Sequence, residues 1–226
     1  GFRMAEAKAP GGTMSHAELS KVAVRWLKRN RGAGGPGCHI AMSETKSGWG
    51  GEIPDAIGFR ATGWEDGSIV VEVKTSHSDF LADRKKPHRQ DGKGMGNWRY
   101  FMCPEGLIKP DELPAGWGLL WVNSRGHVKP MAGPAVYYRE GGYSLVEEQT
   151  AAWRLPSDLE REQWLLVKLL NRVGDPEQLN ANLKLAYSEK NRMAIRVNEQ
   201  NEELQRLRTE NYNLKNRLKT ATEVTP

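Results

Sequence analysis

Three residues with the chemistry of a metal-dependent hydrolase lie close together in the sequence. Asp55 lies in a short segment that precedes a turn, and Glu72 and Lys74 lie in the apolar segment 68–75 that follows it. Side chains alternate between the two faces of a strand, so Glu72 and Lys74 are expected on one face while apolar neighbours fill the other. If the two segments pair as strands, Asp55 and Glu72 converge.

Two carboxylates brought close together repel each other unless a cation lies between them. Magnesium suits such an oxygen-rich site and keeps several water molecules in its shell. A metal-bound water is a natural nucleophile for hydrolysis of a phosphodiester, and Lys74 could orient it, deprotonate it or stabilise the transition state. The alternative is an ordinary salt-bridged hairpin, because an acid two residues before a lysine is common in strands.

Helical and strand-like segments surround these residues. Segment 15–30 is predicted as a helix, because Ser15 and Glu18 have the spacing of a capping box before an apolar stripe. Glu65-Asp66-Gly67 is a hairpin signal between two strands. The remaining predicted elements are strands at 38–42, 52–60, 68–75, 98–103 and 117–122, helices at 77–86 and 157–172, and an irregular or edge-strand segment at 127–147. This order predicts an α/β core with a mixed sheet flanked by helices.

The spacing of these residues resembles a known superfamily. Pro54-Asp55 followed by Glu72-Val73-Lys74 is similar to the Pro-Asp, spacer, Asp/Glu-x-Lys signature of the PD-(D/E)XK nucleases. The similarity covers about residues 15–125, and the predicted element order agrees with the restriction-endonuclease-like core. The segment 75–85 further resembles the MmcB-type DNA-repair branch and related phage proteins.

The resemblance implies a set of roles for these residues. Asp55 and Glu72 would be metal ligands, the Val73 carbonyl would complete the set, and Lys74 would be the catalytic lysine. Many members also use a glutamate of the first helix, for which Glu18 is the matching residue; its alternative role is that of capping partner. The implied cofactor is Mg²⁺, with Mn²⁺ able to substitute, and the implied product carries a 5′-phosphate.

One segment holds the whole excess of positive charge. The formal charge is +5, and residues 84–99 contain six basic residues against one aspartate, so the rest of the chain is balanced. Such a concentration predicts contact with phosphates, although a solvated loop is the alternative. The predicted nucleic-acid-binding residues are Arg84, Lys85, Lys86, Arg89, Lys93 and Arg99.

The C-terminal part has a heptad pattern that favours a parallel two-stranded coiled coil. Oppositely charged residues occupy g and e positions that face each other in register, and a single asparagine lies at an a position. The alternative is a helix that folds back on its own domain. The residues predicted to make a homodimer are Val197, Leu204, Leu207, Asn211, Leu214 and Leu218.

The predicted organisation is a disordered leader at 1–14, a nuclease core at 15–150, a connecting helix at 151–175 and a dimerisation helix at 176–226. No stretch approaches the roughly 20 apolar residues that span a bilayer. The two cysteines, Cys38 and Cys103, have no metal-ligand spacing and predict reduced thiols in a cytoplasmic protein without a membrane partner.

Together these patterns predict a magnesium-dependent DNA endonuclease. Duplex or branched DNA is expected rather than RNA. The alternative is a catalytically inactive nucleic-acid-binding or adaptor protein on a nuclease-like scaffold. The two hypotheses differ on whether Asp55, Glu72 and Lys74 face a shared divalent ion or are held in ion pairs of their own.

Overall fold

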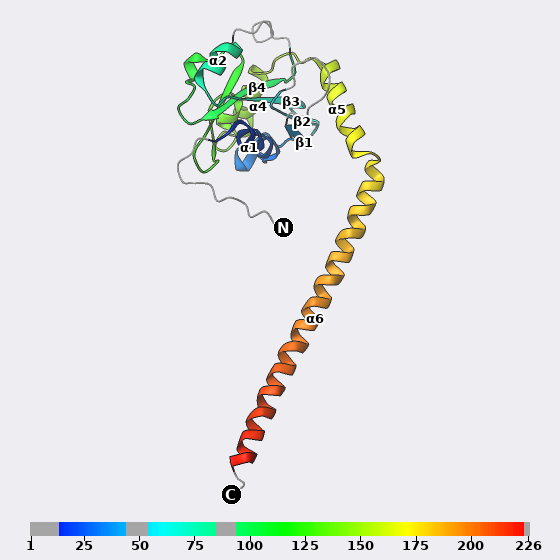
Figure 1. The fold of residues 1–226 in the computed structure, drawn as a ribbon. Coiled ribbons are helices and arrows are strands. Elements are labelled where there is room, and N and C mark those ends of the chain that lie inside the picture. Colours follow the sequence, from blue (N-terminus) through cyan, green and yellow to red (C-terminus); the bar gives the residue numbers. More distant parts are fainter. Residues whose placement is uncertain (1–13, 44–53, 85–93, 224–226) are drawn as a thin grey trace. The chain divides into compact units, whose positions relative to one another are not determined.

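The computed structural model describes residues 14–43, 54–84 and 94–223, without the side chains of 84, 172–173 and 219–223. The chain divides into two units, Gly1–Gln163 and Trp164–Pro226, which we describe separately. The first is a mixed α/β unit with a six-stranded sheet, and the second contains a long C-terminal helix (Figure 1). The division lies within the predicted connecting segment 151–175.

In chain order, the elements are α1 (His16–Lys28), η1 (Arg31–Ala33), β1 (Ile40–Ser43), β2 (Ala56–Arg60), β3 (Gly67–Val73), α2 (His77–Arg84), β4 (Trp98–Pro104), η2 (Pro110–Glu112), β5 (Trp117–Val122), β6 (Val128–Ala132), η3 (Pro134–Tyr137), α4 (Tyr143–Ala152), α5 (Leu159–Val173) and α6 (Pro176–Glu223).

The strands follow one another across the sheet in the order in which they occur in the chain. The pairs β1–β2, β2–β3 and β5–β6 are antiparallel, whereas β3–β4 and β4–β5 are parallel. The β2–β3 hairpin was predicted from its turn residues. Parallel strands need a crossover, and α2 supplies it between β3 and β4.

Two hydrophobic clusters lie on opposite faces of this sheet. Alternate residues of β3 and β4, including Val71 and Tyr100, pack with the apolar stripe of α1. The intervening residues of β4 and β5, including Phe101 and Leu119, pack with Phe80 of α2. Figure 1 shows α1 and α2 on either side of the strands. Both faces of the central strands are therefore buried, as is usual where strands are parallel.

The first helix begins where the sequence predicts. Ser15 accepts a hydrogen bond from the backbone N–H of Glu18, and the Glu18 carboxylate accepts one from the backbone N–H of Ser15. This reciprocal capping box satisfies two backbone donors at the start of the helix. It places His16 in the first turn of α1, directly after the cap.

The segment 127–147 is more regular than the sequence predicts. It contains β6 as an edge strand, but residues 143–152 form α4 and not irregular structure. Only Val146 and Thr150 of α4 are buried, so the helix lacks the broad apolar stripe that a sequence pattern needs. The carbonyl of Thr150 accepts a hydrogen bond from the Trp98 indole at 2.8 Å, which attaches α4 to β4.

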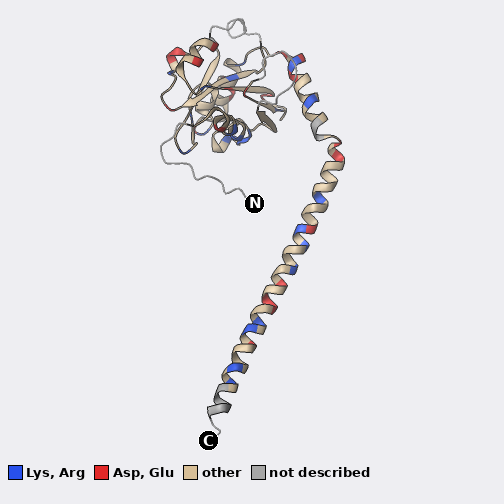
Figure 2. Ribbon diagram, viewed as in Figure 1, with Lys and Arg blue, Asp and Glu red and all other residues tan. Residues whose placement is uncertain are grey.

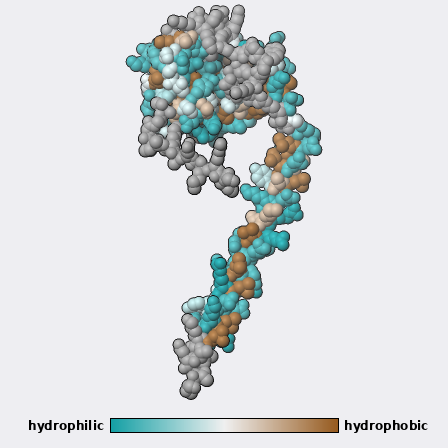
Figure 3. Space-filling model, viewed as in Figure 1, coloured by the Kyte–Doolittle hydropathy of each residue, from teal (hydrophilic) through white to brown (hydrophobic). Residues whose placement is uncertain are grey.

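In the second unit, α6 is a single helix of 48 residues. Acidic and basic residues are interspersed along it (Figure 2), and apolar residues recur on its surface (Figure 3). The predicted seam residues Val197, Leu204 and Leu214 are between 48% and 53% exposed. Among the helices of the described residues, none has the length and apolar character of a membrane span.

Close packing between α1 and the sheet gives a prediction at Gly58 of β2. A Cβ atom there would lie 2.7 Å from Cys38 Sγ and 3.3 Å from Leu27 Cβ. Gly58→Ala is therefore expected to lower the free energy of unfolding by about 1–3 kcal/mol through overpacking, measured by urea denaturation. Gly32→Ala is the control, because its nearest neighbour would be 3.8 Å away. Equal stabilities of the two variants would contradict the packing that we describe.

Candidate active site

Asp55 lies directly before β2 and is tied to the end of β3. Its Oδ2 accepts a hydrogen bond from the backbone N–H of Val73 at 2.7 Å. Ala56 pairs with Val71 at the edge of the β2–β3 ladder, so Asp55 and Glu72 each lie one residue beyond that pair. The structure thus brings two predicted site residues to the same end of two neighbouring strands.

His16 is a neighbour of Asp55 that the sequence analysis did not assign to the site. The His16 Nε2 lies 3.2 Å from Asp55 Oδ1, and the Asp55 side chain is only 15% exposed. A carboxylate has about four lone-pair positions, so His16 and the Val73 N–H leave it able to accept further contacts. A neutral imidazole is also a metal ligand, which makes His16 a second group that could serve a cation here.

Lys74 follows β3, and its backbone N–H continues the parallel ladder by donating to the Met102 carbonyl at 2.9 Å. Its Nζ lies 3.3 Å from Oδ2 of Asp83, which is in the last turn of α2. Both side chains are largely buried, at 12% and 4% exposure. An ammonium group has three donors, so this ion pair fixes Lys74 without using all of its hydrogen-bonding capacity.

Glu72 of β3 is half-buried, whereas its neighbours Val71 and Val73 are fully buried. This confirms the expected alternation of β3. Among the residues that the structure describes, no group of three or more histidines, cysteines and acids is arranged to hold a metal. Magnesium commonly binds through one or two carboxylates plus waters and substrate phosphates, so a two-carboxylate site suits it better than a closed protein cage.

Glu18 has the capping role that the sequence left as one of two alternatives. Its Oε2 accepts hydrogen bonds from the Ser15 N–H at 2.8 Å and from the Ser15 hydroxyl at 2.9 Å. To serve as a metal ligand, this carboxylate would share or give up these contacts. His16, also in α1, contacts Asp55 through its Nε2.

Residues after β3 support the site structurally. The Ser76 hydroxyl accepts a hydrogen bond from the Asp79 N–H at 3.2 Å, so it caps α2. His77 is paired with Glu112 of η2 at 2.6 Å. Hydrogen bonds from the Lys109 backbone and from His77 lower the pKa of the Glu112 carboxyl. These contacts cap α2 and join its first turn to η2.

The predicted nucleic-acid-binding residues have different outcomes. Lys85, Lys86, Arg89 and Lys93 lie outside the described residues, and of Arg84 only the backbone is described, as the last residue of α2.

The prediction that Arg99 binds nucleic acid is corrected, because its side chain is buried and the residue is only 3% exposed. Its guanidinium donates to the carbonyls of Gly96, Gly94 and Pro156 at 2.9–3.0 Å. We therefore assign Arg99 to the interior of the fold, where it holds the segment before β4, and not to a nucleic-acid surface.

The two cysteines take no part in this site. Cys38 and Cys103 are free and buried in the two separate hydrophobic clusters. Burial raises the pKa of the Cys38 thiol to about 12 and that of the Cys103 thiol to about 11. Thiolates are the reactive form, so both residues are expected to be inert in the folded protein.

Comparisons with known proteins add little to this description. No family model matches the chain, and no curated protein matches it. A solved structure of a protein of unknown function from Silicibacter pomeroyi is similar, with 18% sequence identity and a TM-score of 0.36, over 70% of this chain and 92% of that one.

The Lys74–Asp83 pair gives a prediction about stability. Removing one partner of a buried ion pair leaves an uncompensated charge, so Asp83→Ala is expected to lower the free energy of unfolding by about 3–5 kcal/mol. Combining it with Lys74→Met should recover much of that loss, because no buried charge remains. Urea denaturation of the two single variants and the double variant measures the coupling energy. Additive losses would show that the two groups do not interact.

Proposed function

We propose that this protein is a metal-dependent endonuclease with a PD-(D/E)XK-like core, in which Asp55, Glu72 and Lys74 form the active site. The observation that carries the proposal is the hydrogen bond from the Val73 N–H to the Asp55 carboxylate. It holds Asp55, which directly precedes β2, against the end of β3, where Glu72 and Lys74 lie. An ordinary hairpin has no need of three ionisable groups at one end of two buried strands.

The proposed roles follow from the chemistry of each group. Asp55 and Glu72 bind Mg²⁺, together with the Val73 carbonyl, and the bound metal would supply an activated water and neutralise charge on the phosphate. Lys74 acts as a fixed positive charge beside the scissile phosphate. Its ion pair with Asp83 requires the ammonium form, which favours charge stabilisation over the role of general base.

His16 has two roles open to it in this proposal. Through its contact with Oδ1 it orients the Asp55 carboxylate, which also receives the Val73 N–H. It could also take one position on the metal, as a glutamate of the first helix does in related nucleases. The first role needs no rearrangement, so we favour it.

The alternative is an inactive nucleic-acid-binding or adaptor protein on the same scaffold. The ion pairs of Lys74 and Asp55 favour it, since each group already has a partner. This alternative does not explain why the two acidic residues Asp55 and Glu72 lie at the same end of the β2–β3 hairpin. A cleavage assay separates the two.

We also propose that α6 pairs with a second copy of the chain as a parallel coiled coil. Its large apolar a and d residues are 44–68% exposed over the described part of the helix. A long helix of low mean hydropathy gains stability mainly by packing that stripe against a partner. Two linked copies would place two active sites on one DNA molecule, which suits cutting both strands and raises binding through avidity.

Cleavage of supercoiled plasmid in Mg²⁺ or Mn²⁺ tests the enzyme proposal. Asp55→Asn and Glu72→Gln should abolish nicking, because a neutral amide is a poor ligand for magnesium. Asp55→Asn keeps an acceptor for the Val73 N–H, so its loss of activity would not reflect a broken strand contact. Lys74→Ala should lower the rate by about 100-fold or more.

Glu105→Gln, an exposed acid elsewhere in the same unit, is the matched control and should cleave like the original protein. EDTA should stop the reaction in every sample. If all three site variants kept full activity, another site would be responsible. If the original protein cut nothing with either metal, the adaptor alternative would take its place.

Light scattering of the purified protein tests the coiled coil. Leu207→Glu combined with Leu214→Glu puts charges at two d positions and is expected to give monomers, as should a chain that ends after about residue 173. Ile195→Glu is the matched control, because this residue is 59% exposed but lies at an f position outside the seam. Dimers that survive the double substitution would point to another interface.

A further inference from the structure

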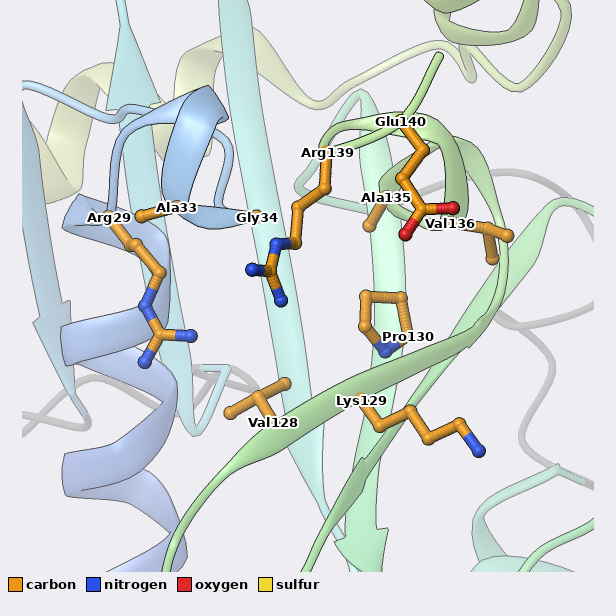
Figure 4. Close-up of a pocket in the computed structure, with 10 residues that line it drawn as sticks. All are labelled: Arg29, Ala33, Gly34, Val128, Lys129, Pro130, Ala135, Val136, Arg139 and Glu140. Atoms are coloured by element: carbon orange, nitrogen blue, oxygen red, sulfur yellow. The ribbon is translucent and has the colours of Figure 1, made fainter.

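A positively charged pocket lies in the first unit, apart from the proposed active site. A pocket of about 340 Å³ opens between the end of α1, η1, β6 and the residues after η3 (Figure 4). Three cations line it, Arg29, Lys129 and Arg139, against the single carboxylate of Glu140. The pocket therefore has a net positive charge.

The two arginines are directed into this pocket. Figure 4 shows the guanidinium groups of Arg29 and Arg139 pointing toward the same space, whereas the Lys129 side chain extends away from both. The stem of Arg139 lies over Gly34, where a Cβ would come within 3.0 Å of its Cγ and Cδ. A glycine at this position, with φ of 82°, thus allows the arginine to lie across the pocket wall.

No acidic side chain pairs with either arginine in the described residues, and like charges that face one space repel each other. Within the described ranges 14–43, 54–84 and 94–223, the side chains of Arg29, Lys129 and Arg139 form no hydrogen bond or ion pair. An anion would relieve the repulsion. A phosphate group suits the site best, because it offers oxygens in several directions to two planar, five-donor guanidinium groups, whereas a carboxylate is satisfied by one.

The position of the pocket connects it with the proposed active site. Arg29 follows the last turn of α1, and His16, which contacts Asp55, is in the first turn of the same helix. Thirteen residues of helix separate them, which is about 20 Å at 1.5 Å per residue. Phosphates of one DNA strand rise by about 3.4 Å per nucleotide, so this distance corresponds to roughly six nucleotides.

We propose that this pocket binds a backbone phosphate of DNA about six nucleotides from the bond that is cut. This inference rests on the proposed function, since it takes DNA as the substrate. Arg29 and Arg139 are then anchoring residues that place the duplex relative to the active site. They contact phosphate and carry no base specificity.

Binding of a fluorescein-labelled 30-base-pair duplex to the full-length protein in EDTA, followed by anisotropy over a range of salt concentrations, tests the proposal. Arg29→Ala combined with Arg139→Ala should bind about tenfold more weakly at low salt. The slope of log K against log salt concentration should become less steep by about one, as expected for one lost phosphate contact.

The matched control is Arg25→Ala combined with Lys28→Ala, which removes the same charge from exposed positions of α1 outside the pocket. If this control lost as much affinity and salt dependence as the pocket variant, the effect would come from the net charge of the protein and not from the pocket, which would overturn the proposal. Unchanged affinity and slope in the pocket variant would overturn it as well.

Two further measurements separate this inference from the proposed function. Because binding is measured in EDTA, a protein that cuts nothing can still show the pocket effect, which would refute the nuclease proposal and keep DNA binding. In a protein that cuts DNA, the pocket variant should raise KM and leave kcat unchanged. Calorimetric titration with inorganic phosphate tests whether the ligand is instead a small phosphate compound. If the pocket variant lost phosphate binding but bound DNA as the original protein does, the pocket would belong to a small phosphate ligand, and the proposed contact with DNA would be wrong.

Discussion

The hydrogen bond between the Val73 N–H and the Asp55 carboxylate fixes the geometry on which the rest of this unit depends. It joins Asp55, one residue before Ala56, to Val73, two residues after Val71, and so closes the end of the β2–β3 ladder. A slip of one residue would turn every side chain of β3 to the opposite face. The alternation of side chains in β3 then decides which residues pack under α1 and which lie on the opposite face of the sheet. The same register that buries Val71 therefore also presents Glu72, so core packing and site geometry share one constraint.

Charged groups at this strand end lie beside partners from the two helices. Asp55 contacts His16 of α1, and Lys74 forms an ion pair with Asp83 of α2. Asp83 lies in the last turn of α2, where the helix dipole disfavours an acid. Lys74 offsets that cost, which gives its ion pair a structural value independent of chemistry. Both oxygens of Asp55 already have partners in this arrangement, since Oδ1 lies near His16 Nε2 and Oδ2 accepts the Val73 N–H. A carboxylate has about four lone-pair positions, so the proposed cation would have to use those that these two contacts leave open.

Local signals in the sequence predicted α1, its capping box and the β2–β3 hairpin, because each depends on residues a few positions apart. The position of Asp55 and Glu72 at the same end of the β2–β3 hairpin also followed once the hairpin was assumed. Contacts over long separations could not be predicted in this way. Arg99 belongs to the most basic segment, yet its guanidinium binds the Pro156 carbonyl 57 residues away. The His16–Asp55 and Lys74–Asp83 contacts depend on how α1 and α2 lie on the sheet, and α4 has too few buried residues for a clear pattern.

The two buried thiols have a consequence for the way this unit opens. Cys38 belongs to the cluster under α1, and Cys103 belongs to the cluster under α2. Both thiols are protonated and shielded in the native state, so alkylating reagents can reach each one only when its own layer separates from the strands. Labelling rates at the two positions thus report separately on the fluctuations of each layer, and equal rates would mean that the whole unit opens cooperatively.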